Sequence, residues 1–327
     1  MSPRPLHERI VRRLRRLLGR APEPATTMPP PWHGPATTLP PIFVGGTGRS
    51  GTTITGRILG AHPSYHMIPF EVRFITDKGG LCDLVEGRTG INGFSRRCQD
   101  RWWKRTEKQG LFLLTDEPSL RGALEELRRE LSRDRYAAGA RFVHRVLDPV
   151  TIKAGKQGWV EMTPPNIMVA DTIAKMWPDA PQVHSVRDGR DVACSVVPLK
   201  WGPGELEAAL DWWAKELAEA FEASDRIPGR VLTVQMEELI LSERAREYAR
   251  LVEFCGLDDA PKLRAFFEGQ ATPERAHIGR WRHDLPEADR AAFDARHARL
   301  AGRILAHGWP YRPNDAPVGD TAAADQA

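Results

Sequence analysis

A glycine-rich turn early in the chain carries the residue types that bind an anion. Residues 42–53 read IFVGGTGRSGTT, in which an apolar run leads into four glycines and then into hydroxyl residues that can open a helix. Glycine permits positive φ angles and close approach of the backbone, so several N–H groups and a helix N-terminus can converge on one ligand. The turn therefore predicts a site for a phosphate-like oxyanion.

Two nucleotide sites fit the turn in part. Gly46 and Gly51 have the spacing of a Walker A site for a nucleoside triphosphate, but Thr52 stands where that site requires lysine. Together with Gly48, the same glycines also satisfy the G-x-G-x-x-G pattern of a dinucleotide site. In that alternative Glu71 would bind the ribose, and the chain would be an NAD-dependent oxidoreductase.

A sulfonucleotide is the third ligand class that fits, and it uses more of the side chains. Arg49 supplies a fixed positive charge beside the hydroxyl groups, which suits a 5′-phosphosulfate. The residues predicted to hold that group with their backbone amides and side chains are Gly48, Arg49, Ser50, Gly51, Thr52 and Thr53.

A second segment repeats this arrangement later in the chain. Residues 183–196 read VHSVRDGRDVACSV and predict a short strand followed by a helix that begins near Asp188. Arg187 then lies at the mouth of the helix, and Ser195 comes about two turns later. A salt-bridged helix start, with Asp188 or Asp191 favoured by the helix dipole, is the alternative interpretation of these charges. Two anion-binding strand ends in one sheet suggest a ligand with two phosphate-like ends.

Together the two segments resemble the sulfotransferases that use 3′-phosphoadenosine 5′-phosphosulfate, in particular their bacterial and tyrosyl-protein branch. In that family a P-R-S-G-T-T type loop binds the 5′-phosphosulfate, and residues 47–53, TGRSGTT, are similar to it. A segment of R-D-x-R-D-x-x-x-S type binds the 3′-phosphate, a role that the resemblance gives to Arg187 and Ser195. A closing loop of G-x-x-G-x-W-K type is similar to residues 277–282, so Arg280, Trp281 and Arg282 are further nucleotide-binding candidates.

The resemblance also names a general base. Sulfuryl transfer needs a base because the acceptor hydroxyl has a pKa far above neutral. In tyrosyl-protein and many bacterial members a glutamate in an E-x-R setting takes this role, and Glu71 and Arg73 in the run PFEVRF look like that pair. A surface salt bridge between the two is the alternative, and His62 and His66 are the second choice of base.

One family feature is missing from the chain. The family often has a lysine in a K-T-P motif that helps to neutralise the leaving group, whereas the run WVEMTPPN has Met162 at that position. Lys153, Lys156 and Lys200 are candidate substitutes. A non-catalytic protein that binds a bisphosphate nucleotide is therefore a further alternative.

The activity implied by the resemblance is transfer of a sulfuryl group from the phosphosulfate nucleotide to a hydroxyl acceptor. The acceptor oxygen attacks in line, Arg49 and the amides of the turn stabilise developing charge, and Glu71 takes the proton. No metal ion is expected. The acceptor class stays open among a small molecule, a glycan and a peptide.

The elements that must position these residues alternate between strand and helix. Strands are predicted at residues 42–45, 159–162, 182–186 and 231–235, a short apolar stretch at 67–70, and helices at 52–59, 117–131 and 205–221. This rhythm predicts an α/β fold of P-loop NTPase-like type, with a mostly parallel sheet flanked by helices. Residues 41–313 are expected to form a single catalytic domain. A basic amphipathic helix and a Pro-rich linker precede it in residues 1–40, and a disordered tail follows in residues 314–327.

Composition limits the class of protein. The chain has 327 residues, of which 41% are hydrophobic, and none of its apolar runs is long enough to span a bilayer. Its four cysteines show no paired spacing, so a cytoplasmic protein is expected. Positive charge is concentrated in residues 4–20, which could rest on an anionic membrane or contact a partner. The rest of the chain has no basic stripe, which argues against nucleic acid as a partner.

Overall fold

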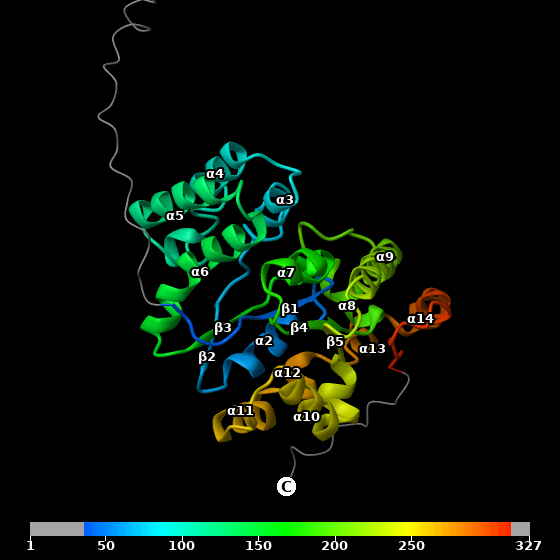
Figure 1. The fold of residues 1–327 in the computed structure, drawn as a ribbon. Helices are drawn as coiled ribbons and strands as arrows, with labels where there is room; N and C mark the ends of the chain where they lie inside the picture. Colours follow the sequence, from blue (N-terminus) through cyan, green and yellow to red (C-terminus); the bar gives the residue numbers. More distant parts are fainter. Residues whose placement is uncertain (1–35, 315–327) are drawn as a thin grey trace, which may run out of the picture. The chain divides into compact units, whose positions relative to one another are not determined.

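The computed structural model describes residues 36–314. The predicted basic helix, most of the linker and the predicted tail apart from Asn314 lie outside these residues. Asn314 is buried and hydrogen-bonded to Asp188, so the expectation of disorder is wrong for this residue. The described chain folds around five parallel strands (Figure 1): β1 (Ile42–Gly46), β2 (Tyr65–Met67), β3 (Gly158–Glu161), β4 (Gln182–Val186) and β5 (Val231–Gln235), in the order β2-β3-β1-β4-β5. The predicted α/β fold with a parallel sheet and helical cover is confirmed.

The order of the strands determines where a ligand can bind. From β1 the chain passes to the edge strand β2 and returns to β3, and it then crosses to β4 on the other side of β1. In parallel α/β sheets, ligands bind beyond the carboxyl ends of the strands where the order reverses in this way. The glycine-rich turn follows β1 and the second anion segment follows β4, so both lie at that edge.

Alternation along the central strand explains why the sheet is covered on both faces. The side chain of Phe43 packs with Trp159 into a cluster formed mainly by the helices of residues 81–176. Ile42 and Val44 point to the other face and pack with Val160 against the helices that follow β1 and β5. Since successive side chains of a strand point to opposite faces, both faces of this sheet are buried.

Thirteen α-helices surround the sheet within the described residues. They are α2 (Thr52–Gly60), α3 (Leu81–Val85), α4 (Ile91–Gln99), α5 (Glu117–Glu130), α6 (Arg135–Lys153), α7 (Ala170–Met176), α8 (Gly189–Val196), α9 (Leu206–Asp225), α10 (Arg244–Phe254), α11 (Pro261–Gln270), α12 (Pro273–Ala276), α13 (Trp281–Asp284) and α14 (Glu287–Ala306). Figure 1 shows α3 to α6 gathered on one side of the sheet, with α10 and α11 on the other. Three short irregular helices, η1 (Leu111–Leu113), η2 (Pro164–Val169) and η3 (Glu238–Ser242), complete the described elements.

The predicted strands agree with the structure except at the edge. The sequence predicts an apolar stretch at residues 67–70, whereas β2 covers Tyr65–Met67. The amide of Ile68 makes the next bond to β3, to the carbonyl of Val160 over 3.0 Å. Pro69 then has no N–H to donate, so the ladder stops and the chain turns away. The residues around Glu71 are therefore irregular and need other contacts to hold them.

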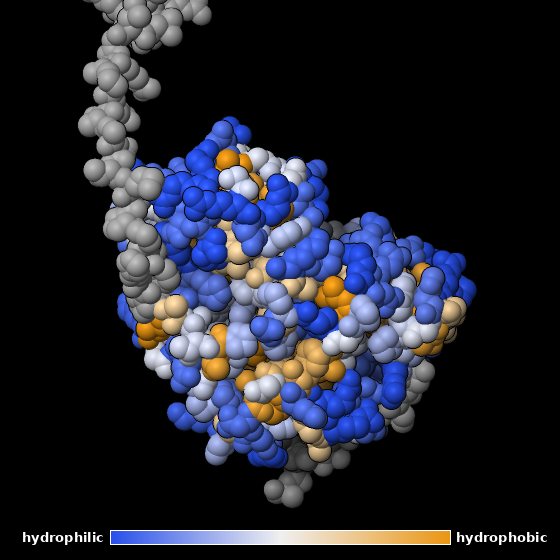
Figure 2. Space-filling model, in the orientation of Figure 1, coloured by the Kyte–Doolittle hydropathy of each residue, from blue (hydrophilic) through white to orange (hydrophobic). Residues whose placement is uncertain are grey.

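The visible surface is largely polar. Figure 2 shows a mostly hydrophilic face, with apolar side chains gathered over the region where Figure 1 draws α2 and α12. Among residues 36–314, the large hydrophobic side chains that are well exposed are Leu113, Trp201 and Leu305. In this part of the chain no helix has the length and apolar character to cross a bilayer.

Candidate anion-binding and active site

The turn after β1 presents unsatisfied N–H groups to the carboxyl edge of the sheet. Arg49 and Gly51 both have positive φ angles, 69° and 94°. Within residues 36–314, the N–H groups of Gly48, Arg49 and Gly51 donate to no backbone carbonyl. Helix α2 then begins at Thr52 with no side-chain cap and no acidic residue in its first turn. Its first N–H groups also lack intrahelical acceptors, so the turn and the helix end together offer an anion several donors.

Two of the four glycines serve close packing rather than the turn itself. A Cβ atom on Gly46 would lie 2.3 Å from the carbonyl oxygen of Ser185 in β4, and one on Gly45 would lie 2.4 Å from the amide nitrogen of Ile167. Both contacts are with backbone atoms, which cannot move aside cheaply. The hydroxyl of Ser185 also donates to the carbonyl of Ser50 over 2.8 Å, which fixes the turn to β4.

Two indole rings lie beside Gly48 in the turn. A Cβ atom on Gly48 would lie 3.0 Å from Trp201 and 3.3 Å from Trp212, whose rings contact each other at 6.0 Å between centroids. Trp201 belongs to the segment between α8 and α9 and is 60% exposed. The turn is therefore bordered by an aromatic wall that the sequence did not predict.

Arg49 joins the two anion segments. Its Nε donates to the hydroxyl oxygen of Ser195 over 2.8 Å. Burial lowers the pKa of the Arg49 guanidinium, the nearby Arg187 and Arg280 lower it further, and Glu71 acts in the opposite direction. Three guanidinium groups thus lie close enough to repel one another, an arrangement that an anion between them would stabilise.

The helix after β4 begins where the sequence predicts. Asp188 is the N-cap of α8, and its carboxylate accepts from the backbone N–H of Arg190 over 2.8 Å. The same carboxylate forms a salt bridge of 2.6 Å with the Arg190 side chain, so this pair is part of the buried helix start. Arg187 forms a buried salt bridge of 3.3 Å with Asp191, and its guanidinium also donates to the carbonyl of His277 in the late loop over 2.6 Å.

Asp191 holds the late loop, residues 277–282, against α8. Its carboxylate accepts from the N–H of Gly279 over 2.7 Å and from the N–H of Trp281 over 3.2 Å. Burial raises the pKa of this carboxyl group. The Trp281 ring is buried, with the guanidinium groups of Arg190 and Arg282 at 4.6 and 4.7 Å from its centroid. The ring therefore anchors the loop, while Arg280 stays close to Arg49.

Glu71 and Arg73 form an ion pair beside the turn. The distance between Glu71 Oε2 and Arg73 Nη2 is 2.5 Å, and both side chains are about one third exposed, at 31% and 32%. A small cavity of about 10 Å³ adjoins them and is lined in part by Phe70, Phe74 and Trp102. The electrostatic effect of Glu71 on Arg49 indicates that the carboxylate lies near the guanidinium cluster.

Two of the lysines considered as substitutes lie at the opposite edge of the sheet. Lys153 ends α6, and Lys156 precedes β3 and donates to the carbonyl of Pro63 over 2.8 Å. His62 lies there too, with its Nε2 at 2.9 Å from a carboxylate oxygen of Asp258. Lys200 alone among the three candidate lysines follows α8, on the side of the turn. The second-choice base His62 is thus remote from Arg49.

Met162 occupies the position of the family lysine as part of the core. It is 5% exposed and belongs to the cluster beneath α2. A Cβ atom on Gly56 would lie 3.0 Å from the Met162 Cβ, and the hydroxyl of Thr53 lies 3.9 Å from its sulfur. This side chain therefore packs against the helix that follows the turn.

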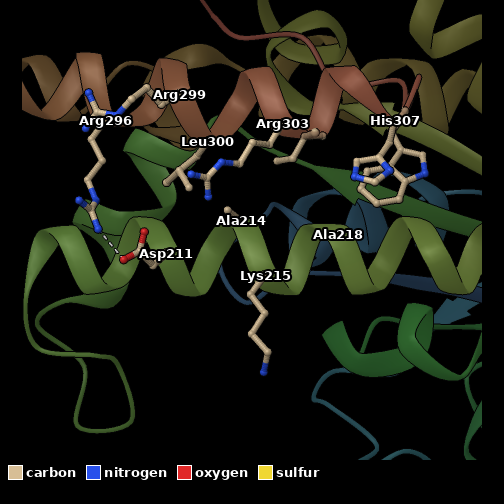
Figure 3. A pocket seen from close by; sticks show the side chains of 11 residues that line it. Asp211, Ala214, Lys215, Ala218, Arg296, Arg299, Leu300, Arg303 and His307 are labelled. Carbon is tan, nitrogen blue, oxygen red and sulfur yellow. Dashed lines mark hydrogen bonds and ion pairs between the residues drawn. The ribbon is translucent and has the colours of Figure 1, made fainter.

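A larger cavity than the one beside Glu71 lies elsewhere. A groove of about 590 Å³ runs between α9 and α14, and none of its lining residues belongs to the two anion segments. Figure 3 shows Arg303 directed into the groove, Lys215 directed away from it, and Arg296 reaching Asp211, an ion pair of 2.5 Å. The converging donors, rather than the volume, identify the candidate site. Among residues 36–314 no three His, Cys, Asp or Glu side chains gather as a metal site would require.

Comparisons with known proteins identify the family. A sequence model of the sulfotransferase family matches residues 40–261. The sulfotransferase domain of the olefin synthase from Synechococcus PCC 7002 is 19% identical over 84% of this chain and 98% of its own, with a TM-score of 0.50. Sulfotransferase STF1 from Mycobacterium tuberculosis H37Rv is 17% identical over 81% and 77%, with a TM-score of 0.44. Mouse sulfotransferase SULT7A1, complexed with PAP, is 11% identical over 82% and 88%, also at 0.44. No curated protein sequence matches the chain.

Proposed function

Because the chain belongs to the sulfotransferase family, we propose that it transfers a sulfuryl group from 3′-phosphoadenosine 5′-phosphosulfate to a hydroxyl acceptor. The observation that carries this proposal is the cluster of Arg49, Arg187 and Arg280 at the carboxyl edge of the sheet, beside an uncapped helix. Asp191 balances part of the charge of Arg187, and Asp284 part of that of Arg280, at 3.3 and 2.6 Å. An anion with two phosphate-like groups would reduce the remaining repulsion among the three guanidinium groups.

The 5′-phosphosulfate would bind at the turn. The free N–H groups of Gly48, Arg49 and Gly51, the N-terminus of α2 with Thr52 and Thr53, and the Arg49 side chain supply donors from several directions. Ser50 has a different part, because its buried hydroxyl donates to the carbonyl of Thr47 over 2.7 Å and so shapes the turn.

The 3′-phosphate would bind between Arg187 and Ser195. The Ser195 oxygen accepts from Arg49, so its hydroxyl proton remains available to a phosphate oxygen. Arg187 keeps one buried nitrogen, Nε, without a partner within residues 36–314. Arg280 and Arg282 belong to the loop held by Asp191 and would close on the nucleotide, with Trp281 as the buried anchor of that loop.

Charge at the leaving phosphate has to be neutralised without the family lysine. Sulfuryl transfer moves charge onto the bridging oxygen, and fixed donors aimed at that oxygen lower the barrier. Arg49 fills this role in our proposal, with Arg280 as the additional cation that compensates for Met162. Lys200 is the alternative source of charge on the same side of the sheet.

Glu71 would act as the general base. It lies near Arg49 and is partly exposed, so an acceptor hydroxyl can reach it from solvent. Arg73 holds the carboxylate from one side and orients the other oxygen toward the acceptor. The acceptor would be a hydroxyl of a small molecule, a glycan or a peptide.

Isothermal titration with adenosine 3′,5′-bisphosphate, with NAD and ATP as controls and without added metal, tests the donor site. Micromolar affinity for the bisphosphate alone is the expected result. Preferential binding of NAD or ATP would overturn the proposal. Binding of the bisphosphate together with no transfer from the phosphosulfate nucleotide to a broad panel of hydroxyl acceptors would instead favour a non-catalytic nucleotide-binding protein.

A further inference from the structure

Glu161 is a carboxylate buried at the carboxyl end of β3. Its side chain is fully shielded from solvent, and the Oε1 atom accepts from the N–H of Val72 over 3.1 Å and from the N–H of Thr163 over 3.0 Å. The hydroxyl of Thr163 also donates to Oε1, and the side-chain amide of Asn166 donates to Oε2. The hydrogen-bond partners of this carboxylate within residues 36–314 are all neutral groups.

These hydrogen bonds connect two parts of the candidate site. Asn166 donates with the same Nδ2 to the carbonyl of Val44 in β1, the strand that leads into the glycine-rich turn. Val72 directly follows Glu71 in a stretch that has no regular helix or strand between Met67 and Leu81. Glu161 therefore links the strand that carries the turn to the backbone that carries the proposed base.

A buried carboxylate without a counter-ion costs free energy, so a strand end held only for stability would be better served by a neutral residue. Here burial raises the pKa of Glu161, while its hydrogen bonds act in the opposite direction. Several donors converge on the two oxygens, and only an ionised carboxylate offers acceptors on both sides. A glutamine would place its amide N–H₂ opposite a donor.

We propose that Glu161 is a positioning residue that fixes Glu71 relative to the glycine-rich turn. This inference rests on the proposed role of Glu71 as the base. Between the bond from Ile68 to β3 and the bond from Val72 to Glu161, only three residues are without a backbone bond to the sheet edge. Loss of the bond from Val72 to Glu161 would leave the backbone around Glu71 less restrained, so the Glu71 carboxylate would move. Catalysis is sensitive to displacements of about 1 Å.

Glu161→Gln is the informative substitution. If its Oε1 keeps the bonds from Val72 and Thr163, its amide N–H₂ faces the Nδ2 of Asn166, which is donor against donor. Flipping the Asn166 amide would repair that contact, but it would then set Oδ1 against the carbonyl of Val44. The variant therefore weakens the link without removing the side chain.

Asp148→Asn is the matched control. Asp148 is also fully buried, and its carboxylate accepts from the indole N–H of Trp159 over 3.1 Å and from the N–H of Thr37 over 3.0 Å. Trp159 lies near the start of β3, at the end of the strand away from Glu161. The control perturbs a buried carboxylate of α6 that bonds to the same strand, away from residues 68–76.

The test combines amide hydrogen exchange with bisphosphate titration and turnover. Glu161→Gln should speed exchange in residues 68–76 by about tenfold, lower kcat by about tenfold or more, and keep the affinity for adenosine 3′,5′-bisphosphate within about twofold. Asp148→Asn should change none of the three. Unchanged exchange in residues 68–76, or faster exchange across the whole sheet with weaker nucleotide binding, would overturn the inference.

A second variant covers the case in which Glu161→Gln does not fold. Asn166→Ala removes the shared donor but keeps the bond from Val72, and we expect faster exchange in residues 68–76 with nucleotide affinity retained. Unchanged exchange there contradicts the link. The base assignment is tested separately by Glu71→Gln. Full turnover in that variant would show that Glu71 is not the base, whatever effect Glu161→Gln has on hydrogen exchange.

Discussion

Arg49 and Ser195, 146 positions apart, are joined by a hydrogen bond of 2.8 Å from the guanidinium Nε to the hydroxyl oxygen. The bond connects the turn after β1 with the helix after β4. Each of these segments resembles an ordinary strand-to-helix junction when considered alone. Joined, they bring the Arg187 guanidinium to within 3.4 Å of the Arg49 carbonyl at one edge of the sheet.

Arg187→Ala is expected to weaken binding of adenosine 3′,5′-bisphosphate by about tenfold to a hundredfold. A hydrogen bond to a charged group contributes roughly 1.5–3 kcal/mol, and the variant loses both the charge and the contact with the late loop. Titration calorimetry checks the affinity. Arg296→Ala, in the groove between α9 and α14, is the control and should bind like the wild type. Equal affinity in both variants would exclude Arg187 from the nucleotide site.

Glu71→Gln is expected to reduce turnover by about a hundredfold or more, because the amide cannot accept the hydroxyl proton. Nucleotide affinity should stay nearly the same, since the carboxylate faces the acceptor rather than the donor in our proposal. Steady-state rates at saturating donor, together with titration of the bisphosphate, separate the two effects. Turnover retained with weakened binding is the pattern that contradicts a base.

Gly46→Ala is expected to destabilise the fold by roughly 1–3 kcal/mol, as overpacking usually does. The new methyl group would meet the carbonyl oxygen of Ser185 at 2.3 Å, and β1 and β4 would have to separate. Gly302→Ala is the control, because nothing lies within 4 Å of that position in α14 and alanine favours a helix. Denaturant unfolding compares the two. Equal stability in both variants would mean that the strand packing is looser than described.

Glu237 should make stability depend on pH. Burial, followed by the charge of Asp188, raises its pKa from 4.5 to about 7. The folded state therefore holds this proton more tightly than the unfolded chain, so the stabilisation is complete below about pH 4.5 and is lost as pH rises through 7. The loss is on the order of 1–3 kcal/mol.

Urea unfolding of the wild type and of Glu237→Gln, at pH 5.5 and at about pH 8.5, measures this contribution. Glutamine imitates the protonated acid and keeps an acceptor for the N–H of Asp188. The variant should lose less stability between the two pH values than the wild type does. A larger loss in the variant would contradict the raised pKa.

The parts of the site that follow local rules could be predicted from the sequence. The start of α8 at Asp188 follows from capping chemistry within a few residues, and the turn after β1 follows from its glycines and hydroxyls. The parallel sheet follows from the alternation of apolar strands with helices. In each case the sequence pattern and the structural element that it predicts belong to the same short segment of the chain.

Contacts between distant segments could not be predicted in this way. Asp191 holds Gly279 across 88 positions, and Glu161 holds Val72 across 89. Neither pairing leaves a pattern in the local sequence, because a carboxylate that accepts backbone N–H groups needs no particular partner residue. Trp201, placed over Gly48 by the path of the chain after α8, was missed for the same reason.

The tethering of the late loop also determines how far the folding unit extends. The family match ends at residue 261, yet Asp191 depends on the amides of Gly279 and Trp281. Farther on, the N–H of Asn314 donates to Asp188 over 3.1 Å. A protein truncated at residue 261 would keep all five strands but expose the charged start of α8. The folding unit therefore extends beyond residue 261, where the family match ends, to the residues that contact α8.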